Sequence, residues 1–116
     1  MPDIQDSNAE IAQNIKYLQD SIYVISGKWK LPILTAVHQG KSRFRDIQRT
    51  VGGITSKVLS KELKELEMNK LIVRKVYDDS PPSVEYTVSN YCDSLHNVVK
   101  ELIDWGKHHR DKIRED

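Results

Sequence analysis

The stretch that decides the fold is Ile54–Val88, which reads ITSKVLSKELKELEMNKLIVRKVYDDSPPSVEYTV. Its first part has the spacing of an amphipathic helix. Its second part holds two β-prone runs separated by turn-forming residues. The sequence therefore predicts a helix that leads directly into a hairpin.

The helical part has an apolar side and a basic side. Helical spacing places four side chains on the apolar stripe: Val58, Leu59, Leu63 and Leu66. It stacks four others along the opposite side: Lys57, Ser60, Lys61 and Lys64. Glu62 and Glu65 are expected on the flanks. Thr55 is the expected N-cap, and Asn69 is the expected C-terminal cap because Asn tolerates the left-handed conformation. A lysine-faced helix alone also fits an ordinary solvated surface helix.

Two strands are predicted next, at Ile72–Tyr77 and Val84–Val88, because both runs are rich in β-branched and aromatic residues. The intervening Asp78–Ser83 holds turn formers and two prolines that cannot donate hydrogen bonds to a ladder. An isolated hairpin is marginal in water, so this one is expected to pack against the helices before it.

The residues upstream complete a helix-turn-helix. Trp29–Gln39 has one apolar face and ends at Gly40, and Phe44–Val51 is a short second helix. Gly52-Gly53 then makes the turn into the lysine-faced helix. The order predicts an α+β, mainly helical fold: a winged helix-turn-helix with a two-stranded wing.

Length and composition favour one globular domain. The chain has 116 residues, 38% hydrophobic and 30% charged, and the whole range 1–116 is expected to form a single unit. No apolar run reaches the roughly 20 residues that span a bilayer, and the polar start does not resemble a secretory signal. A single cysteine excludes an internal disulfide and favours a reducing cytoplasm.

Charge is polarised along the chain although the net charge is only +1. The window Lys41–Lys75 holds ten basic and four acidic residues, which gives it a net charge of +6. This window coincides with the helix and the first strand described above. Such asymmetry is expected of a surface that meets phosphates.

Several short motifs resemble the HxlR-type family of bacterial winged-helix transcription regulators over roughly residues 17–109. The motifs occur in one register, and they are Ile25–Trp29, Phe44–Ile47, Ile54–Glu67, Leu71–Arg74, Pro81–Val88 and Trp105-Gly106. The resemblance implies a homodimeric repressor or activator that binds DNA, and members of the family often respond to reactive small molecules.

The chain departs from the family pattern in two places. Members that sense oxidants usually carry a cysteine shortly before the Gly-Lys-Trp segment, and the corresponding Asn14–Gln19 contains none. Many relatives also place an arginine after the double proline, where this chain has Ser83. With Asp78 and Asp79 nearby, the wing tip is acidic, which argues against a minor-groove arginine contact. The wing is expected to touch the DNA backbone through Lys75 or Ser83, or to contribute little.

Cys92 is expected to open the last helix just after Ser89, its expected N-cap. A helix N-terminus lowers the pKa of a thiol, which would suit a thiol sensor. The favoured interpretation is nevertheless a small, half-buried core residue, and exposure decides between the two.

Both terminal helices carry narrow apolar seams. The seam residues recur every three or four positions, and they are Ile11, Ile15, Leu18 and Ile22 in the first helix and Leu95, Val98, Leu102 and Trp105 in the last. The pattern suits homodimerisation, and it equally suits packing on the domain's own core. The DNA-binding fold favours the dimer. Ranges 1–24 and 89–116 are thus the expected dimerisation parts, and 25–88 the winged-helix core.

The predicted function is sequence-specific DNA binding by a homodimeric transcription regulator on a near-palindromic operator, with its recognition helix in the major groove. The expected DNA contacts are Arg43, Arg45, Arg49, Thr55, Ser56, Lys57, Ser60, Lys61, Lys64, Lys75 and Ser83, with Lys41 beside them. No phosphate loop, nucleophile elbow or metal-ligand spacing occurs in the sequence, so no enzyme, metal or cofactor is expected, and the small-molecule effector stays unidentified. The alternatives are a winged-helix protein-interaction module that does not bind DNA and an effector-binding, enzyme-like domain.

Overall fold

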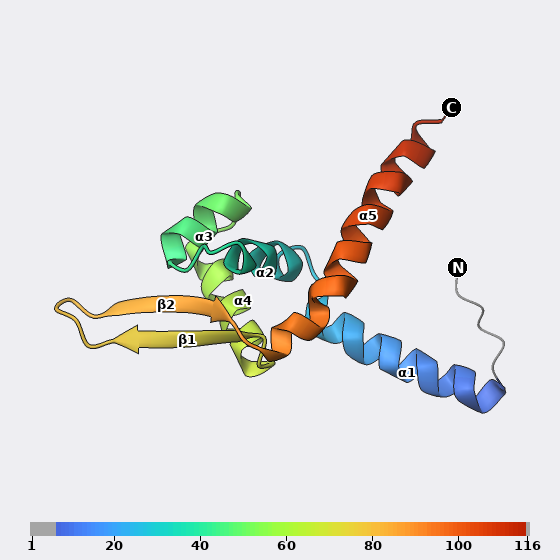
Figure 1. The fold of residues 1–116 in the computed structure, drawn as a ribbon, viewed down its shortest axis with the longest axis horizontal. Helices are drawn as coiled ribbons and strands as arrows, with labels where there is room; N and C mark the ends of the chain where they lie inside the picture. Colours follow the sequence, from blue (N-terminus) through green and yellow to red (C-terminus); the bar gives the residue numbers. More distant parts are fainter. Residues whose placement is uncertain (1–6, 116) are drawn as a thin grey trace.

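The computed structural model describes residues 7–115. Within them the helices are α1 (Asn8–Ile25), α2 (Lys30–His38), α3 (Phe44–Val51), α4 (Ser56–Met68) and α5 (His96–Ile113), the strands are β1 (Ile72–Tyr77) and β2 (Ser83–Val88), and a 3-10 segment, η1 (Tyr91–Leu95), precedes α5. Helices α2, α3 and α4 cluster together, the hairpin extends from them to one side, and α1 and α5 project to the other (Figure 1). This arrangement confirms the predicted mainly helical α+β fold with a two-stranded wing.

The helix-turn-helix forms where the sequence predicts it. Helix α3 has the predicted bounds, and the turn after it uses Gly52 and Gly53 at φ values of 78° and 74°, which favour glycine. Thr55 caps α4, since its hydroxyl accepts a hydrogen bond from the Val58 amide at 3.2 Å.

The end of α4 differs from the prediction in one detail. Asn69 is the C-cap residue and its side-chain amide donates to the Glu65 carbonyl at 3.1 Å, but its φ is −87°. The left-handed residue is Lys70, at φ 66°. The expectation that Asn69 adopts the left-handed conformation is therefore wrong, because the chain reverses one residue later.

The hydrophobic core lies where α2, α3 and α4 meet the base of the hairpin. Its buried residues are Ile33, Leu34, Val37, Ile47, Ile54, Leu59, Leu63, Leu66, Leu71, Ile72 and Cys92. Three of the four predicted stripe residues of α4 are among them, and the fourth, Val58, is half-buried against the cluster. Burial of the stripe leaves the opposite face of α4 free for solvent or a ligand.

The hairpin is antiparallel, with Ile72 opposite Val88 and Tyr77 opposite Ser83. It is joined to the loop between α2 and α3 by a backbone hydrogen bond from the Tyr86 amide to the Ser42 carbonyl at 2.8 Å. This contact provides the support that an isolated hairpin lacks.

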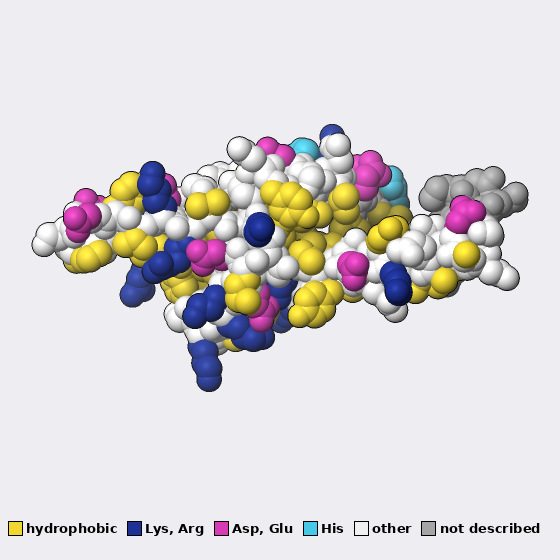
Figure 2. All heavy atoms as spheres, turned by 90° about the horizontal axis from the view of Figure 1, so that it is seen from below, with side chains coloured by type: hydrophobic (Ala, Val, Ile, Leu, Met, Phe, Trp, Pro, Cys, Tyr) yellow, Lys and Arg dark blue, Asp and Glu magenta, His cyan; other side chains and the backbone are white. Residues whose placement is uncertain are grey.

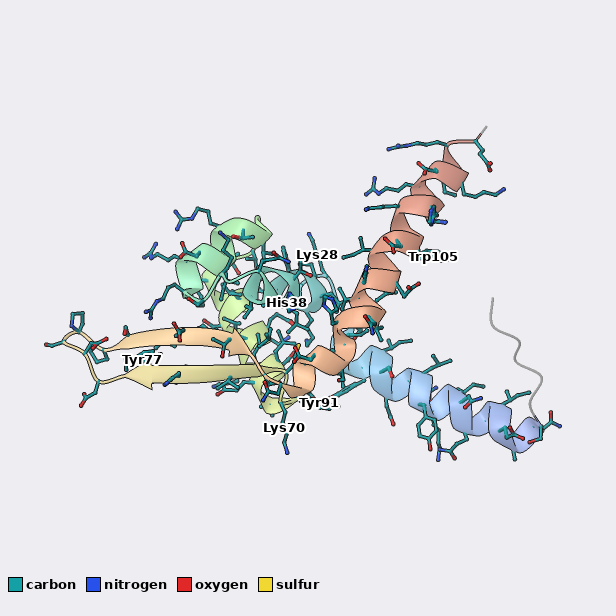
Figure 3. The ribbon with its side chains drawn as sticks, in the orientation of Figure 1. Lys28, His38, Lys70, Tyr77, Tyr91 and Trp105 are labelled. Carbon is teal, nitrogen blue, oxygen red and sulfur yellow. The ribbon has the colours of Figure 1, made fainter. Side chains whose placement is uncertain are left out.

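Helices α1 and α5 stand largely free of the core. Seven of the eight predicted seam residues have exposed fractions between 40% and 65%, and they are Ile11, Ile15, Leu18, Ile22, Val98, Leu102 and Trp105. The alternative that these seven pack on the chain's own core is therefore wrong. Trp105 lies on the projecting part of α5 (Figure 3).

Leu95 is the exception among the seam residues. It belongs to η1 and is half-buried against the core cluster. The expectation that Leu95 continues the exposed seam is therefore wrong, because η1 packs this side chain against the core. None of the helices within residues 7–115 combines the length and the apolar content that crossing a membrane requires.

Candidate nucleic-acid interface

The outward side of α4 is polar and basic. Its exposed residues include Lys57, Ser60, Lys61 and Lys64, the four that the sequence places there. In the space-filling view, Lys and Arg side chains gather on one side of the body, next to the hairpin (Figure 2). A helix that buries its apolar stripe and presents lysines and serines outward has the form of a recognition helix.

A glutamine that the sequence analysis did not single out fixes the start of α4. The Gln48 side-chain amide of α3 donates to the Ile54 carbonyl at 3.1 Å and to the Ser56 hydroxyl at 3.2 Å. These bonds tie the end of α3 to the first turn of α4. Ser56 accepts in this contact, so its own hydroxyl proton stays available for an outward hydrogen bond.

A buried ion triad holds α4 against α2. Lys30, in the first turn of α2, places its Nζ 2.7 Å from Glu62 Oε2 and 2.6 Å from Glu65 Oε2. The side chains of Lys30 and Glu62 are each 11% exposed. The flank of α4 on which the sequence places Glu62 is not open to solvent, because Lys30 of α2 covers it. The signal that was available is Lys30 itself, a lone cation in the apolar segment around α2.

The triad favours the charged forms of Lys30 and Glu65. Burial works to lower the pKa of Lys30, but hydrogen bonds and charges from Glu62 and Glu65 outweigh it and raise that pKa. The hydrogen bond from Lys30 lowers the pKa of Glu65. The two charge-assisted hydrogen bonds donated by Lys30 fix the orientation of α4 relative to α2.

Some of the residues expected to contact phosphates already make bonds within the chain. The Arg43 guanidinium donates to the Val84 carbonyl of β2 at 2.8 Å, and Arg49 pairs with Asp46 at 2.7 Å. Lys61 lies 3.6 Å from Glu65 on the exposed side of α4. Arg45 and Lys41 are exposed. Arg43 therefore holds the wing to the start of α3.

Polar side chains of the wing contact one another. Ser83 donates to Asp79 at 2.8 Å, the Tyr77 hydroxyl donates to Glu85 at 3.0 Å, and Lys75 lies 5.2 Å from the centre of the Tyr77 ring. Acidic side chains appear at the far end of the hairpin (Figure 2). The tip thus has the acidic character that the sequence indicates.

Cys92 is buried, at 8% exposure, and its amide donates to the Ser89 hydroxyl at 3.1 Å. Burial, aided by the charge of Asp93, raises the pKa of the Cys92 thiol. The possibility of a lowered thiol pKa is thereby excluded, because desolvation outweighs any effect of the helix start. The core-residue interpretation fits both the burial and the pKa.

The sequence analysis also missed a contact between two histidines. His38 at the end of α2 stacks on His96 at the start of α5, with ring centres 5.1 Å apart. Among residues 7–115, no three His, Cys, Asp or Glu side chains gather closely enough to hold a metal ion.

The fold and the basic face of α4 define a winged helix-turn-helix protein of the DNA-binding class. The model of the family described as HxlR-like helix-turn-helix matches residues 24–114. The chain belongs to this family, which confirms the resemblance seen in the sequence.

Relatives and solved structures agree with this assignment. The chain is 38% identical over 106 residues to BH0655, an HTH-type transcriptional regulator of Halalkalibacterium halodurans, covering 86% of this chain and 94% of that protein. It is 38% identical to the HTH-type transcriptional regulator YtcD of Bacillus subtilis, covering 83% of this chain and 76% of YtcD.

Two solved structures are similar over most of the chain. The redox regulator HypR in its reduced form has a TM-score of 0.79 at 32% identity, covering 85% of this chain and 98% of HypR. The crystal structure of YtcD has a TM-score of 0.75 at 39% identity, covering 81% of this chain and 96% of that one. The chain is thus a DNA-binding transcription regulator of the HxlR-like family.

Proposed function

We propose that the chain acts as a homodimer that inserts α4 of each copy into the major groove of a near-palindromic operator. The observation that carries the proposal is the exposed face of α4. It bears lysines and serines and is held in place from beneath by Lys30 and from its first turn by Gln48. A rigidly supported helix can position hydrogen-bonding groups against base edges.

The proposal assigns two kinds of DNA contact. Side chains in the first two turns of α4 read base edges, and they are Ser56, Lys57 and Ser60. Basic residues around them neutralise phosphates and set the register, and they are Lys41, Arg45, Arg49, Lys61, Lys64 and Lys75. Thr55 and Arg43 contribute mainly by positioning α4 and the wing, since both already make internal hydrogen bonds. Ser83 is assigned at most a backbone contact.

The dimer is proposed from the two exposed seams. Seven apolar side chains on α1 and α5 have exposed fractions of at least 40%, which is costly for helices that face only water. A second copy offers the same narrow seams and would cover them by helix packing. Two-fold symmetry then places the recognition helices in successive major grooves, about 34 Å apart.

No thiol switch and no enzymatic activity are part of the proposal. HypR is a redox regulator, but here the cysteine is buried and its thiol pKa is raised. BH0655 and YtcD are transcriptional regulators.

Selection of bound duplexes from a random pool, followed by a salt titration on the selected site, tests the DNA proposal. Each phosphate contact contributes about 0.9 to the slope of log affinity against log salt, so Lys61→Glu should reduce the slope by about 2 per dimer. Lys107→Glu, an equal charge reversal at an exposed position of α5, is the matched control and should leave the slope nearly unchanged. Equal losses for both variants would overturn the assignment of α4, and a chain that binds no duplex would favour the protein-interaction module.

Analytical ultracentrifugation tests the dimer separately. Leu18→Asp places a charge in the α1 seam, where its exposed fraction is 61%, and is expected to yield monomers. Gln19→Asp, one position away and also exposed, is the control and should remain dimeric. A wild-type chain that sediments as a monomer at micromolar concentration would refute the dimer.

A further inference from the structure

A small cavity lies between α2 and the first turns of α5. Its volume is about 170 Å³, and its apolar wall is formed by Leu34 of α2, Leu95 of η1, and Val99 and Ile103 of α5. The stacked pair His38 and His96 also lines it. In Figure 3, His38 is labelled beside α2, on the side of the core from which α5 departs. All of these walls come from one chain, so the cavity exists without a partner.

The size of the cavity suits a single ring. An apolar cavity of about 150 Å³ in a protein interior stays dry and binds benzene. The larger hollow beside it, of about 510 Å³, includes Leu102 of the exposed α5 seam in its lining. The two hollows share Val99 and Ile103, but of the two it is the smaller one that reaches Cys92 and the paired histidines, whose polar atoms a ligand can meet.

The lining favours a neutral ligand with one polar group. Cys92 contributes a thiol whose pKa is raised, so its surface in the cavity is uncharged. Lys100 is the one lining residue with a formal charge, and because its side chain is exposed to solvent that charge is screened. The two imidazole rings offer a flat stacking surface and nitrogens that can accept or donate a hydrogen bond.

We propose that this cavity is an effector site that binds a neutral, single-ring aromatic molecule carrying one hydrogen-bonding group. The ring occupies the space between Leu34, Val99 and Ile103, and the polar group meets the imidazoles of His38 and His96. Phenol is the simplest molecule of this class.

Ligand binding here would be coupled to DNA binding, and this coupling rests on the proposed dimer. One wall of the cavity is α2, whose Lys30 holds the recognition helix. The other wall is the start of α5, whose free part carries Trp105 and the dimer seam away from the core (Figure 3). A ring between the two helices changes the angle at which α5 leaves the core. In a dimer that angle sets the separation of the two recognition helices.

The test is a titration of the full-length chain with phenol, without DNA, followed by NMR of methyl-labelled Ile, Leu and Val. The expected result is saturable shifts at Leu34, Leu95, Val99 and Ile103, with no shifts at Ile11 or Ile15 of α1. Benzoate, an anion of similar size, should bind at least about tenfold more weakly, because entering an apolar cavity costs a charged group its hydration. Shifts spread over the whole surface, an absence of saturation, or tighter binding of benzoate would each overturn the proposal.

Two variants localise the binding. Val99→Phe adds a ring inside the cavity and should weaken phenol binding at least about tenfold, since the volume is already filled. Asn97→Phe adds the same ring at an exposed position of α5 and should leave phenol binding unchanged. Circular dichroism and melting temperature establish that each variant is folded. The methyl shifts of the wild-type chain test the site even if a variant fails to fold. If phenol binds as expected but the chain fails to bind DNA, the site stands and the proposed function fails. If the chain binds DNA but does not bind phenol, the proposed function stands and the proposed effector site fails.

Discussion

Replacement of Lys30 by Met should strongly destabilise the chain. The methionine keeps most of the stem volume but removes the cation that pairs with Glu62, whose side chain is 11% exposed. Removing one partner of a buried ion pair typically costs 3–5 kcal/mol, because the other charge stays buried without compensation. We expect about 3 kcal/mol here, the low end, because Glu65 is 37% exposed and can turn its carboxylate to water.

Urea unfolding at a fixed protein concentration measures this effect. With a slope near 1.5 kcal/mol per molar, a loss of about 3 kcal/mol lowers the midpoint by about 2 M. The double variant Lys30→Met with Glu62→Leu removes both buried charges and should recover most of the stability, since apolar replacements of buried pairs are often close to neutral. A single variant that loses under about 1 kcal/mol, or a double variant no more stable than the single one, would refute the account of the triad.

The pH dependence provides a second check. The hydrogen bond from Lys30 holds the pKa of Glu65 below its ordinary value in the folded chain. Its contribution to stability is therefore present above about pH 4.3, the ordinary value for Glu, and is lost as the pH falls through the lowered folded pKa. The stability difference between wild type and Lys30→Met should accordingly narrow below about pH 4. A difference that stays constant down to pH 2 would contradict this reasoning.

Three further predictions concern single residues. Thr55→Ala removes the N-cap bond to the Val58 amide and should cost about 1 kcal/mol in thermal or urea unfolding, with an unchanged midpoint as the contrary result. Cys92 should react with iodoacetamide far more slowly in the native chain than in urea, and Cys92→Ser should leave any response of DNA binding to peroxide unaltered; rapid native alkylation would reopen the sensor interpretation. Ser83→Arg should raise DNA affinity and steepen the salt slope by up to about 2 per dimer if the wing tip reaches the backbone, whereas unchanged binding would place the tip away from DNA.

Local rules predicted local structure well. Phe44–Val51 is a helix with those bounds, Gly52-Gly53 turns with positive φ, and Thr55 caps the next helix. Each of these depends on residues within a few positions of one another, where steric and capping preferences act directly. The exposed basic face of α4 follows from helical periodicity in the same way.

What could not be predicted depends on residues distant in the sequence. Glu62 is buried because Lys30, 32 positions earlier, lies against it, and no periodic pattern marks that pair. Leu95 leaves the seam because the 3-10 segment packs it on the core, and His38 meets His96 only through the way α5 returns to α2. For Cys92, the position near the start of a helix left a lowered thiol pKa possible, but burial in the core raises that pKa instead.

Helix α1 has a consequence for how the regulator responds to its own abundance. All of its 18 residues are exposed or half-buried, whereas most of the stability of a helix in a protein comes from packing of its apolar face. If a second copy supplies the missing apolar contacts, the order of α1 depends on protein concentration. Operator occupancy then rises with about the square of the number of chains when they are scarce. A regulator built this way would convert a twofold change in its synthesis into a roughly fourfold change in promoter binding.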